Sequence, residues 1–399
     1  MRIAIVTESF PPDVNGVANS VARIADHLVA RGHQPLVVAP APGVATPAIA
    51  PATPYPVVRV PSVPLPRYRQ VRLGLPARRL AQALVAHAPD VVHLASPFVL
   101  GARGGALARR LGVPTVAVFQ TDVAAYARLY RAGCTAGAAW RWLRAIHNGA
   151  DRTLAPSTAA ARDLTAHGVA RVWLWPRGVD ADLFHPDRRS DRLRALLAPD
   201  GEAIVGYVGR LAAEKRVDLL AATARLPGVR TVVVGDGPAR RSLERALPGA
   251  VFLGARHGVR LAHLFASFDV FVHPGPYETF GQTVQEAMAS GLPVVAPAAG
   301  GPMDLVAPGR TGLLVPPGDG AALAGAVAAL VADAPRRRAY GAAGRAAVAG
   351  RTWAAVGDEL IGHYRAVCGQ RDPRPAPRPG RPQPRPVSRS GRPAVSSAS

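Results

Sequence analysis

The sequence predicts an α/β protein with two doubly wound parallel sheets, one in each half of the chain. Three observations carry this prediction. At 399 residues the chain is too long for one ordinary core, so two domains are expected. Short, continuously apolar segments alternate with helical patterns from the first residue, which is typical of βαβ units. The alternation then starts again after residue 200.

The first half begins with the apolar segment 2–8, which has the character of a strand buried on both faces. A helical pattern that ends at Gly32 follows it, and a second such pattern covers 77–88. The other strands expected in this half are 35–40, 57–61, 91–95, 115–119 and 152–156.

The second half repeats the pattern and then ends in helices. Its expected strands are 203–209, 230–236, 250–254, 269–274, 292–297 and 311–316. Proline, glycine and aspartate punctuate residues 174–189, which marks the join between the halves. The predicted division of the chain is an N-terminal domain over 1–178, a C-terminal domain over 179–352, a helix over 353–370 that crosses back to the first domain, and a disordered Pro/Arg-rich tail over 371–399.

Composition narrows the class of protein. The formal net charge is +22, and a basic surface attracts nucleic acid, anionic membranes or phosphorylated ligands. Two cysteines make neither a disulfide framework nor a metal cluster, which favours a reduced, cytoplasmic setting. The longest apolar run, 321–332, is shorter than the ~18 residues of a spanning helix. We therefore expect a cytoplasmic protein that is at most peripheral on the inner face of a membrane.

The end of the first strand is a candidate ligand site, because open parallel sheets bind ligands beyond the carboxyl ends of their strands. Asn15 and Gly16 stand there, just before a helix. Backbone N–H groups at such a place can bind an anion, and the glycine lets a ligand approach closely. The alternative is a plain turn with an N-cap.

The first strand of the second half ends in a pair of cations. Gly209 and Arg210 end this strand, and Lys215, the only lysine of the chain, is expected to start the next helix. An arginine fork and a compact lysine charge beside a helix start suit a diphosphate. The alternative is a surface salt bridge of Lys215 with Glu214 or Asp218.

Two glutamates flank a third helix start. Glu278 and Glu286 are separated by seven residues, and a helix is expected to open at 279–281 and run to Ser290. Eight helical steps would place the carboxylates roughly 12 Å apart, about the span from the sugar to the ribose of a nucleotide-sugar. Glu278 would then accept sugar hydroxyls and Glu286 those of the ribose. The diphosphate between them would lie on the backbone amides of Phe280, Gly281, Gln282 and Thr283.

At these residues the chain resembles the retaining GT-B glycosyltransferases of family 4. The resemblance covers nearly everything up to about residue 368, and it implies two Rossmann-like domains that face each other across a cleft. The motifs that carry it are DVNGVA (13–18), RGVDADLF (177–184), VGRLAAEKRVD (208–218), VVVGDGP (232–238), ETFGQTVQEAMASGLPVVA (278–296) and GRTGLLVPPGD (309–319).

The resemblance also implies roles for single residues and no metal or cofactor. Arg210, Lys215 and Glu278 are the expected catalytic residues. The expected donor-binding residues are Gly16, Gln120, Asp122, Gly209, Phe280, Gly281, Gln282, Thr283 and Glu286. The acceptor is expected to attack from the face on which the diphosphate leaves, so that the anomeric configuration is retained.

Within the family the chain looks like the GDP-mannose-dependent α-mannosyltransferases that build mannolipids of actinobacterial type, with a lipid-linked or glycan hydroxyl as acceptor. A UDP-sugar-dependent transferase is the alternative: glucosyl or sulfoquinovosyl transfer to diacylglycerol, or glucosaminyl transfer to inositol phosphate. One departure from the family stands at Gln120, where a histidine is expected. Glutamine can form hydrogen bonds but cannot act as an acid or a base.

Other segments carry further predictions. Arg256 and His257 follow a strand and could border the nucleobase. The D-x-D pattern at 180–182 lies in the inter-domain segment and is expected to serve the linker, and the GDGP turn at 235–238 lacks the full dinucleotide fingerprint.

The segment 63–76 is a candidate contact with an anionic membrane or acceptor lipid, and an ordinary loop is the alternative. Its arginines and aromatic residue are Arg67, Arg69, Arg72 and Tyr68. A nucleic-acid-binding protein is a rival interpretation of the charge, but the chain lacks interleaved aromatic residues, so no nucleic-acid partner is expected. A sugar-nucleotide epimerase with the same fold is the second rival.

Overall fold

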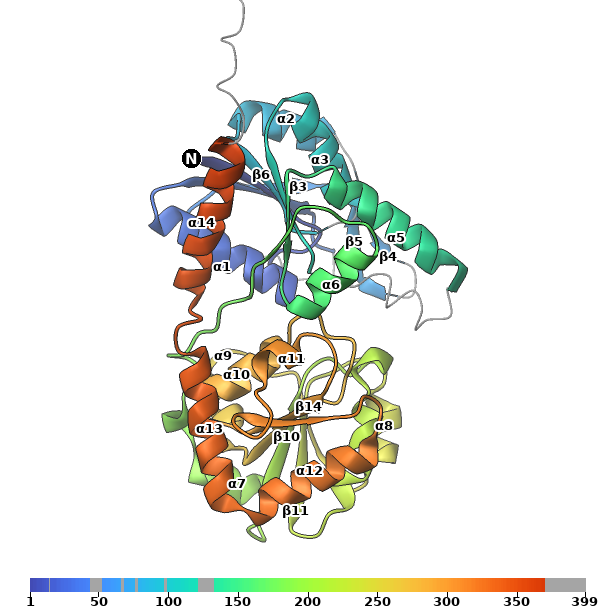
Figure 1. Cartoon of the computed structure of the whole chain (residues 1–399), viewed down its shortest axis with the longest axis vertical. Helices are drawn as coiled ribbons and strands as arrows, with labels where there is room; N and C mark the ends of the chain where they lie inside the picture. Colours follow the sequence, from blue (N-terminus) through green and yellow to red (C-terminus); the bar gives the residue numbers. More distant parts are fainter. Residues whose placement is uncertain are drawn as a thin grey trace, which may run out of the picture.

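The computed structural model describes residues 1–13, 15–43, 52–65, 68–75, 78–96, 99–120 and 133–369. The chain forms two α/β domains that lie end to end along the long axis of the molecule, and a last helix returns to the first domain (Figure 1). The segment 371–399, for which a disordered tail is predicted, lies outside the described residues.

The N-terminal domain contains a seven-stranded sheet in the order β3-β2-β1-β6-β7-β8-β9, in which every pair is parallel. Along β1, Ile3 and Ile5 enter one hydrophobic core while Ala4 and Val6 enter another. Both faces of the sheet are therefore buried, which explains the continuous apolar runs. The elements are β1 (Arg2–Val6), α1 (Gly16–Ala30), β2 (Gln34–Pro40), β3 (Val57–Val60), α2 (Arg78–His87), β6 (Val91–Leu94), α3 (Val99–Arg110), β7 (Thr115–Val118), α5 (Gly133–Asn148), β8 (Arg152–Ala155), α6 (Thr158–Ala166) and β9 (Val172–Leu174).

The C-terminal domain contains a six-stranded parallel sheet in the order β12-β11-β10-β13-β14-β15. Its strands are β10 (Ala203–Val208), β11 (Val229–Val234), β12 (Val251–Gly254), β13 (Val270–Val272), β14 (Val294–Pro297) and β15 (Gly312–Val315). Its α-helices are α7 (Asp191–Leu197), α8 (Arg240–Ala246), α9 (Gly258–Ser267), α10 (Gln282–Ala289), α11 (Pro302–Leu305), α12 (Gly320–Ala332) and α13 (Ala334–Val348). Three 3₁₀ turns join β10 to β11: η2 (Ala213–Lys215), η3 (Val217–Ala221) and η4 (Thr223–Arg225).

The twelve strands predicted from the sequence are all present, but the segment 63–76 is not an irregular loop. It contributes most of an antiparallel pair formed by β4 (Ser62–Leu65) and β5 (Tyr68–Gly74). The guanidinium of Arg72 donates to the hydroxyl of Ser62 at 2.7 Å and to its carbonyl at 2.9 Å, so it is engaged within the pair. Arg67 and the side chains of Tyr68 and Arg69 lie outside the described residues. The lipid-contact prediction for this segment stays a prediction.

The carboxyl ends of the two sheets meet at the junction between the domains. The hydroxyl of Thr279 donates to the carbonyl of Gln120 at 3.3 Å, and the backbone N–H of Thr158 donates to the carboxylate of Asp304 at 2.6 Å. In each sheet the order in which successive strands are added reverses, between β1 and β6 in the first and between β10 and β13 in the second. These are the switch points at which such sheets bind ligands.

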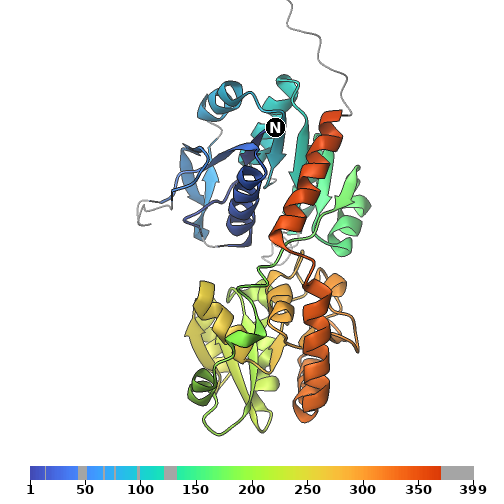
Figure 2. The ribbon, with the colours of Figure 1, turned by 90° about the vertical axis from the view of Figure 1, so that its left-hand side faces the viewer.

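The last helix, α14 (Trp353–Gly369), packs against α1 and joins the core of the N-terminal domain (Figures 1 and 2). Tyr364 is fully buried, and its hydroxyl lies 2.7 Å from Nδ1 of His93. Burial lowers the pKa of His93 to about 3, so its ring is neutral. The indole N–H of Trp175 donates to the carbonyl of Val356 at 3.0 Å. Of the helices in the described part of the chain, none has both the length and the apolar character needed to cross a membrane.

We predict that Tyr364→Phe lowers the free energy of unfolding by about 1–3 kcal/mol, because the buried Nδ1 of His93 loses its partner. Urea unfolding followed by circular dichroism measures this change. Tyr277→Phe is the matched control, because Tyr277 is 42% exposed. Equal stability of the two variants would contradict the prediction.

Candidate active site

The single lysine forms an ion pair across the C-terminal domain. Nζ of Lys215 lies 2.5 Å from Oε2 of Glu278, and the two side chains are 17% and 20% exposed. The backbone of Gly275 passes against Lys215, since an added Cβ would lie 3.1 Å from the lysine Cα. The sequence predicted that Lys215 begins an α-helix. It is instead the last residue of the 3₁₀ turn η2.

The acidic residues near Lys215 in the sequence are paired elsewhere. Glu214 is fully buried and accepts a hydrogen bond from Arg210, while Asp218 forms an ion pair with Arg216 at 3.1 Å. A local surface salt bridge therefore does not account for Lys215. Its partner lies 63 residues away in the chain and on a different strand connection.

Glycines shape the turn that presents Arg210. The hydroxyl of Tyr207 donates to the carbonyl of Arg210 at 3.1 Å and would lie 2.6 Å from a Cβ at Gly209. A Cβ at Gly235 would lie 1.9 Å from the carbonyl oxygen of Gly209. The GDGP turn therefore packs under the Arg210 turn, and its glycines are required by this close approach.

The helix α10 begins at Gln282, later than predicted, so Glu278 precedes it in a loop. The estimate of 12 Å between the two carboxylates assumed a helical rise from Glu278 and does not apply to the residues before Gln282. Gly281 is the N-cap, with φ of 99° and no capping side chain. The amides of the first turn, including those of Gln282 and Thr283, therefore have no side-chain cap and can bind an anion.

A glycine pair supports the loop before α10. A Cβ at Gly300 would lie 2.4 Å from the carbonyl oxygen of Glu278, and a Cβ at Gly301 would lie 2.2 Å from that of Phe280. The N–H of Gly301 donates to the carbonyl of Glu278 at 2.7 Å. This contact fixes the backbone on which the Glu278 carboxylate is presented to Lys215.

The two glutamates have opposite electrostatic environments. Burial alone would raise the pKa of Glu278, but Lys215, His273 and Arg177 together lower it to about 2. Burial raises the pKa of Glu286 to about 7, opposed by a hydrogen bond from the amide of Gln282 at 3.3 Å. At neutral pH Glu278 is ionised, while Glu286 is close to half protonated.

Gly16 lies at the start of α1, and the N-cap alternative holds there. Oδ1 of Asn15 accepts hydrogen bonds from the amides of Val17 and Ala18, both at 3.0 Å. Two amides at this helix start are therefore already satisfied, in contrast to those of α10. An anion at α1 would have to use other groups.

Gln120 is buried at the end of β7, and its amide is engaged with the protein. Nε2 donates to the carbonyl of Ala95 at 3.1 Å, and Oε1 accepts from Arg177 at 2.7 Å. Asp122 lies outside the described residues. Gln120 is thus part of a hydrogen-bond network within the protein.

Two residues of the site were missed in the sequence. Arg177 is buried, and its Nη1 donates to the carbonyl of Gly16 at 3.1 Å. His273 is also buried, and its Nε2 lies 3.7 Å from Oε2 of Glu278. Burial lowers the pKa of His273 to about 4, so the ring beside Glu278 is neutral. Their positions in the sequence could have indicated them, because a polar residue that follows a buried strand lies at the edge of the sheet where ligands bind.

Other predicted groups lie away from this cluster. Arg256 and His257 are exposed and follow β12, the edge strand, which is separated from β10 by β11. Asp180 forms an ion pair with Arg23 at 3.1 Å and accepts the amide of Leu183 at 3.0 Å, which is the linker role expected of the D-x-D pattern.

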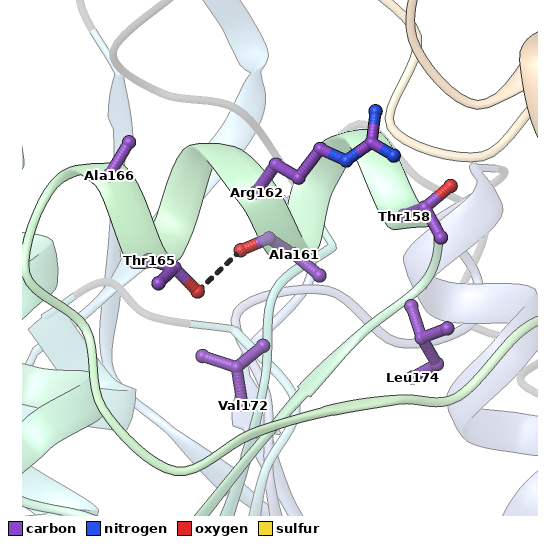
Figure 3. A pocket seen from close by; sticks show the side chains of 7 residues that line it. All are labelled: Thr158, Ala161, Arg162, Thr165, Ala166, Val172 and Leu174. Carbon is purple, nitrogen blue, oxygen red and sulfur yellow. Dashed lines mark hydrogen bonds between the residues drawn. The ribbon is translucent and has the colours of Figure 1, made fainter.

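A hollow of about 530 Å³ lies between α6 and β9 (Figure 3). Its lining is mostly apolar, and Arg162 is the charged residue in it. It is lined by Thr158, Ala161, Arg162, Thr165, Ala166, Val172 and Leu174, a set that contains none of the predicted donor-binding residues. It is therefore separate from the candidate active site.

Comparison with known proteins adds an independent finding. The family model described as Glycosyltransferase Family 4 matches residues 14–183, and the one described as Glycosyl transferases group 1 matches residues 189–347. A GDP-mannose-dependent alpha-mannosyltransferase of Mycolicibacterium smegmatis is 54% identical over 378 residues, which cover 94% of this chain and 100% of that protein. The sulfoquinovosyl transferase SQD2 of Arabidopsis thaliana is 37% identical over 80% of this chain and 64% of its own length. Sucrose-phosphate synthase from Thermosynechococcus elongatus shares the fold, with a TM-score of 0.77 over 93% of this chain and 100% of its own, at 23% identity.

The opposed carboxylates give a prediction that spectroscopy can test. Glutamate occurs seven times in the sequence, so a protein labelled with ¹³C at glutamate carboxyls gives few signals. The signal that disappears in Glu286→Gln should titrate near pH 7, and the one that disappears in Glu278→Gln should stay ionised down to about pH 2. Titration of both signals near the ordinary glutamate value would contradict the assignment.

Proposed function

The chain belongs to glycosyltransferase family 4, and from this premise we propose that it transfers mannose from GDP-mannose to a hydroxyl of a lipid-linked or glycan acceptor, with retention at the anomeric carbon. The observation that carries the proposal is the Lys215–Glu278 ion pair beside the uncapped start of α10. It puts a cation, a carboxylate and amides without a side-chain cap in one place. A sugar diphosphate needs all three.

The residues that bind the donor contribute to catalysis mainly by stabilising the charge of the leaving diphosphate. The diphosphate gains negative charge as it leaves, and Arg210, Lys215 and the first amides of α10 are fixed where that charge develops. Glu278 holds the ammonium of Lys215 in place and accepts hydrogen bonds from sugar hydroxyls. Glu286 accepts those of the ribose, and its carboxylate form predominates only above about pH 7.

Retention follows from attack on the front face. The acceptor oxygen forms a bond to the anomeric carbon on the side from which the diphosphate departs, and a phosphate oxygen of the leaving group takes the acceptor proton. A double displacement would need two carboxyl groups about 5–5.5 Å apart, one of them free to attack. Glu278 is bound to Lys215, and Glu286 lies within α10. The proposal assigns the chain no metal and no cofactor.

The choice of donor rests on degree of similarity. The relative named as GDP-mannose-dependent is 54% identical over its full length, while the sulfoquinovosyl relative is 37% identical over 64% of its length. These values favour GDP-mannose. UDP-sugar-dependent transfer, of glucose or sulfoquinovose to diacylglycerol or of glucosamine to inositol phosphate, remains the second candidate.

We predict that Lys215→Ala lowers mannosyl transfer by about 10²–10³-fold, because the departing diphosphate loses one fixed cation. Lys215→Arg should also be impaired, because a planar fork cannot replace a compact ammonium. Transfer of labelled mannose from GDP-mannose into a total lipid extract measures the rate, and NMR of the product gives the anomeric configuration. UDP-glucose and UDP-sulfoquinovose serve as competing donors.

Arg216→Ala is the control for these variants, since Arg216 pairs with Asp218 on the surface side of the same turn. It should retain most of the activity. Normal turnover in Lys215→Ala would refute the assignment of the site, and preference for a UDP-sugar would refute the assignment of the donor.

A lipid acceptor requires a route to a membrane, and the N-terminal domain is the basic one. Residues 1–178 hold 20 arginines and seven acidic residues, whereas residues 179–352 hold 20 basic and 16 acidic residues. Since anionic headgroups attract basic surfaces, we propose that the enzyme associates peripherally with an anionic membrane through the first domain.

The helix α5 is suited to this contact. Trp142 is 52% exposed and is flanked by the exposed Arg141 and Arg144, whereas Trp140 and Leu143 of the same helix are buried. The helix lies on the outer flank of the domain (Figure 1). An exposed tryptophan between arginines matches the boundary between headgroups and acyl chains.

We predict that Arg141→Ala with Arg144→Ala weakens sedimentation with phosphatidylglycerol vesicles about 30-fold, since each arginine near an anionic surface contributes about 1 kcal/mol. Trp142→Ala should weaken binding further. Arg241→Ala with Arg245→Ala removes the same charge from the exposed face of α8 and is the control. Equal binding to neutral and anionic vesicles would contradict the proposal.

A further inference from the structure

Arg177 connects three separate parts of the candidate active site. It lies in the segment that leaves β9 for the second domain. Its guanidinium donates to the carbonyl of Gly16 at 3.1 Å and to Oε1 of Gln120 at 2.7 Å, and its own carbonyl accepts from Gln285 of α10 at 3.1 Å. The side chain of Arg177 therefore joins the start of α1 to the end of β7, and its carbonyl binds the helix that follows Glu278.

The charge of Arg177 is buried beside neutral partners. The residue is 7% exposed, and both guanidinium hydrogen bonds in the described part of the chain go to neutral oxygens. Burial lowers the pKa of Arg177 to about 10, so it stays protonated at neutral pH, and the negative charge of Glu278 opposes the shift. A buried cation without a bound carboxylate is costly. Its retention at this point favours a role in the site over a role in packing alone.

Gly16 lies close against the guanidinium of Arg177. A Cβ at Gly16 would lie 2.8 Å from Nη1 of Arg177, which is closer than side-chain carbons normally come. The glycine that was predicted to make room for a ligand therefore makes room first for an arginine. This places the Arg177 charge at the same strand end as the predicted donor loop.

Gln120 is suited to hold this cation. Its amide offers an acceptor to Arg177 and a donor to the carbonyl of Ala95, and it carries no charge at any pH. A histidine at this position would repel Arg177 when protonated. The glutamine at the place where a histidine is expected is thus explained by its partner.

We propose that Arg177, held by Gln120, is a positioning residue that aligns the start of α1 in the first domain with Glu278 and α10 of the second. The pair supplies a cation at the position of the expected histidine, and its charge does not depend on pH in the physiological range. This inference rests on the proposed function, because alignment matters only if a donor and an acceptor react between the domains.

The proposed role of Arg177 should affect kcat but not the KM for the donor. The diphosphate is held by Arg210, Lys215 and α10, all in the second domain, so loss of Arg177 should leave the donor KM within about threefold. Misalignment of reacting groups by about 1 Å costs on the order of 10²-fold in rate. Arg177→Gln should therefore lower kcat about 10²-fold, and Arg177→Lys should restore part of it.

Two further variants identify the pair. Gln120→Ala should lower kcat, and adding it to Arg177→Gln should cost little more, because both remove one interaction. Arg177→His should make kcat fall as pH rises through the histidine pKa, a dependence absent from Arg177→Lys. A purely structural role would not create this pH profile. Arg23→Gln, which removes an exposed ion pair with Asp180 from the same linker, is the control and should leave kcat unchanged.

The outcomes are distinguishable. Wild-type kcat in Arg177→Gln, or a parallel loss of kcat and of GDP-mannose binding in calorimetry, overturns the inference while the proposed function stands. Absence of wild-type turnover with every donor overturns both. A fall in kcat at constant donor affinity, with rescue by lysine and a new pH profile in Arg177→His, supports the inference even if the variants are less stable.

Discussion

Several groups of the candidate site follow the carboxyl ends of parallel strands, and this geometric constraint organises the molecule. Gly16 follows β1, Gln120 follows β7, Arg210 follows β10 and Glu278 follows β13. Because the strands of each sheet are parallel, these groups lie at one edge of their sheet. The glycines at 209, 235, 300 and 301 then let the connecting backbones approach closely enough for side chains to meet. The fold thus brings the site residues to one edge of each sheet, and the glycines let their backbones approach closely.

Three cations act at this edge of the sheets in different ways. Lys215 is paired with Glu278, Arg210 with Glu214, and Arg177 with the neutral Gln120. The first two are partly exposed and able to meet a ligand, whereas Arg177 is buried and acts through its neighbours. The carboxylates divide similarly, since Glu278 is ionised by its cations and Glu286 is left to burial. Placement, not the number of charges, determines what each group can do.

The strands that are buried on both faces could be predicted from the sequence, whereas contacts between residues distant in the chain could not. Strands such as β1 and β10 are apolar on both faces, so their sequence pattern predicted them. The edge strand β9 is short and largely unburied, and β4 contains Pro64, so neither has that pattern. The partner of Lys215 lies 63 residues away, which no local pattern reveals.

Composition also decided which cation could be found. The single lysine is conspicuous among the arginines, whereas Arg177 is one of 47 arginines and nothing in the sequence distinguishes it from the others. Only its burial and its three contacts distinguish it.

The two chain crossings between the domains lie side by side, and this limits how the site can change shape. The amide of Val179 donates to the carbonyl of Arg351 at 2.8 Å, and a Cβ at Gly178 would lie 2.6 Å from Cα of Trp353. Any rotation of one domain against the other must turn at this crossing. The contact of Thr158 with Asp304 joins one domain to the other directly, through elements outside the crossing. Arg177 is one residue from the crossing, so a rotation would move its backbone little while carrying Gly16 and Glu278 in opposite directions. A buried cation beside this crossing, bonded to Gly16 and Gln120 of one domain and through its carbonyl to Gln285 of the other, is therefore placed to hold the two domains in register.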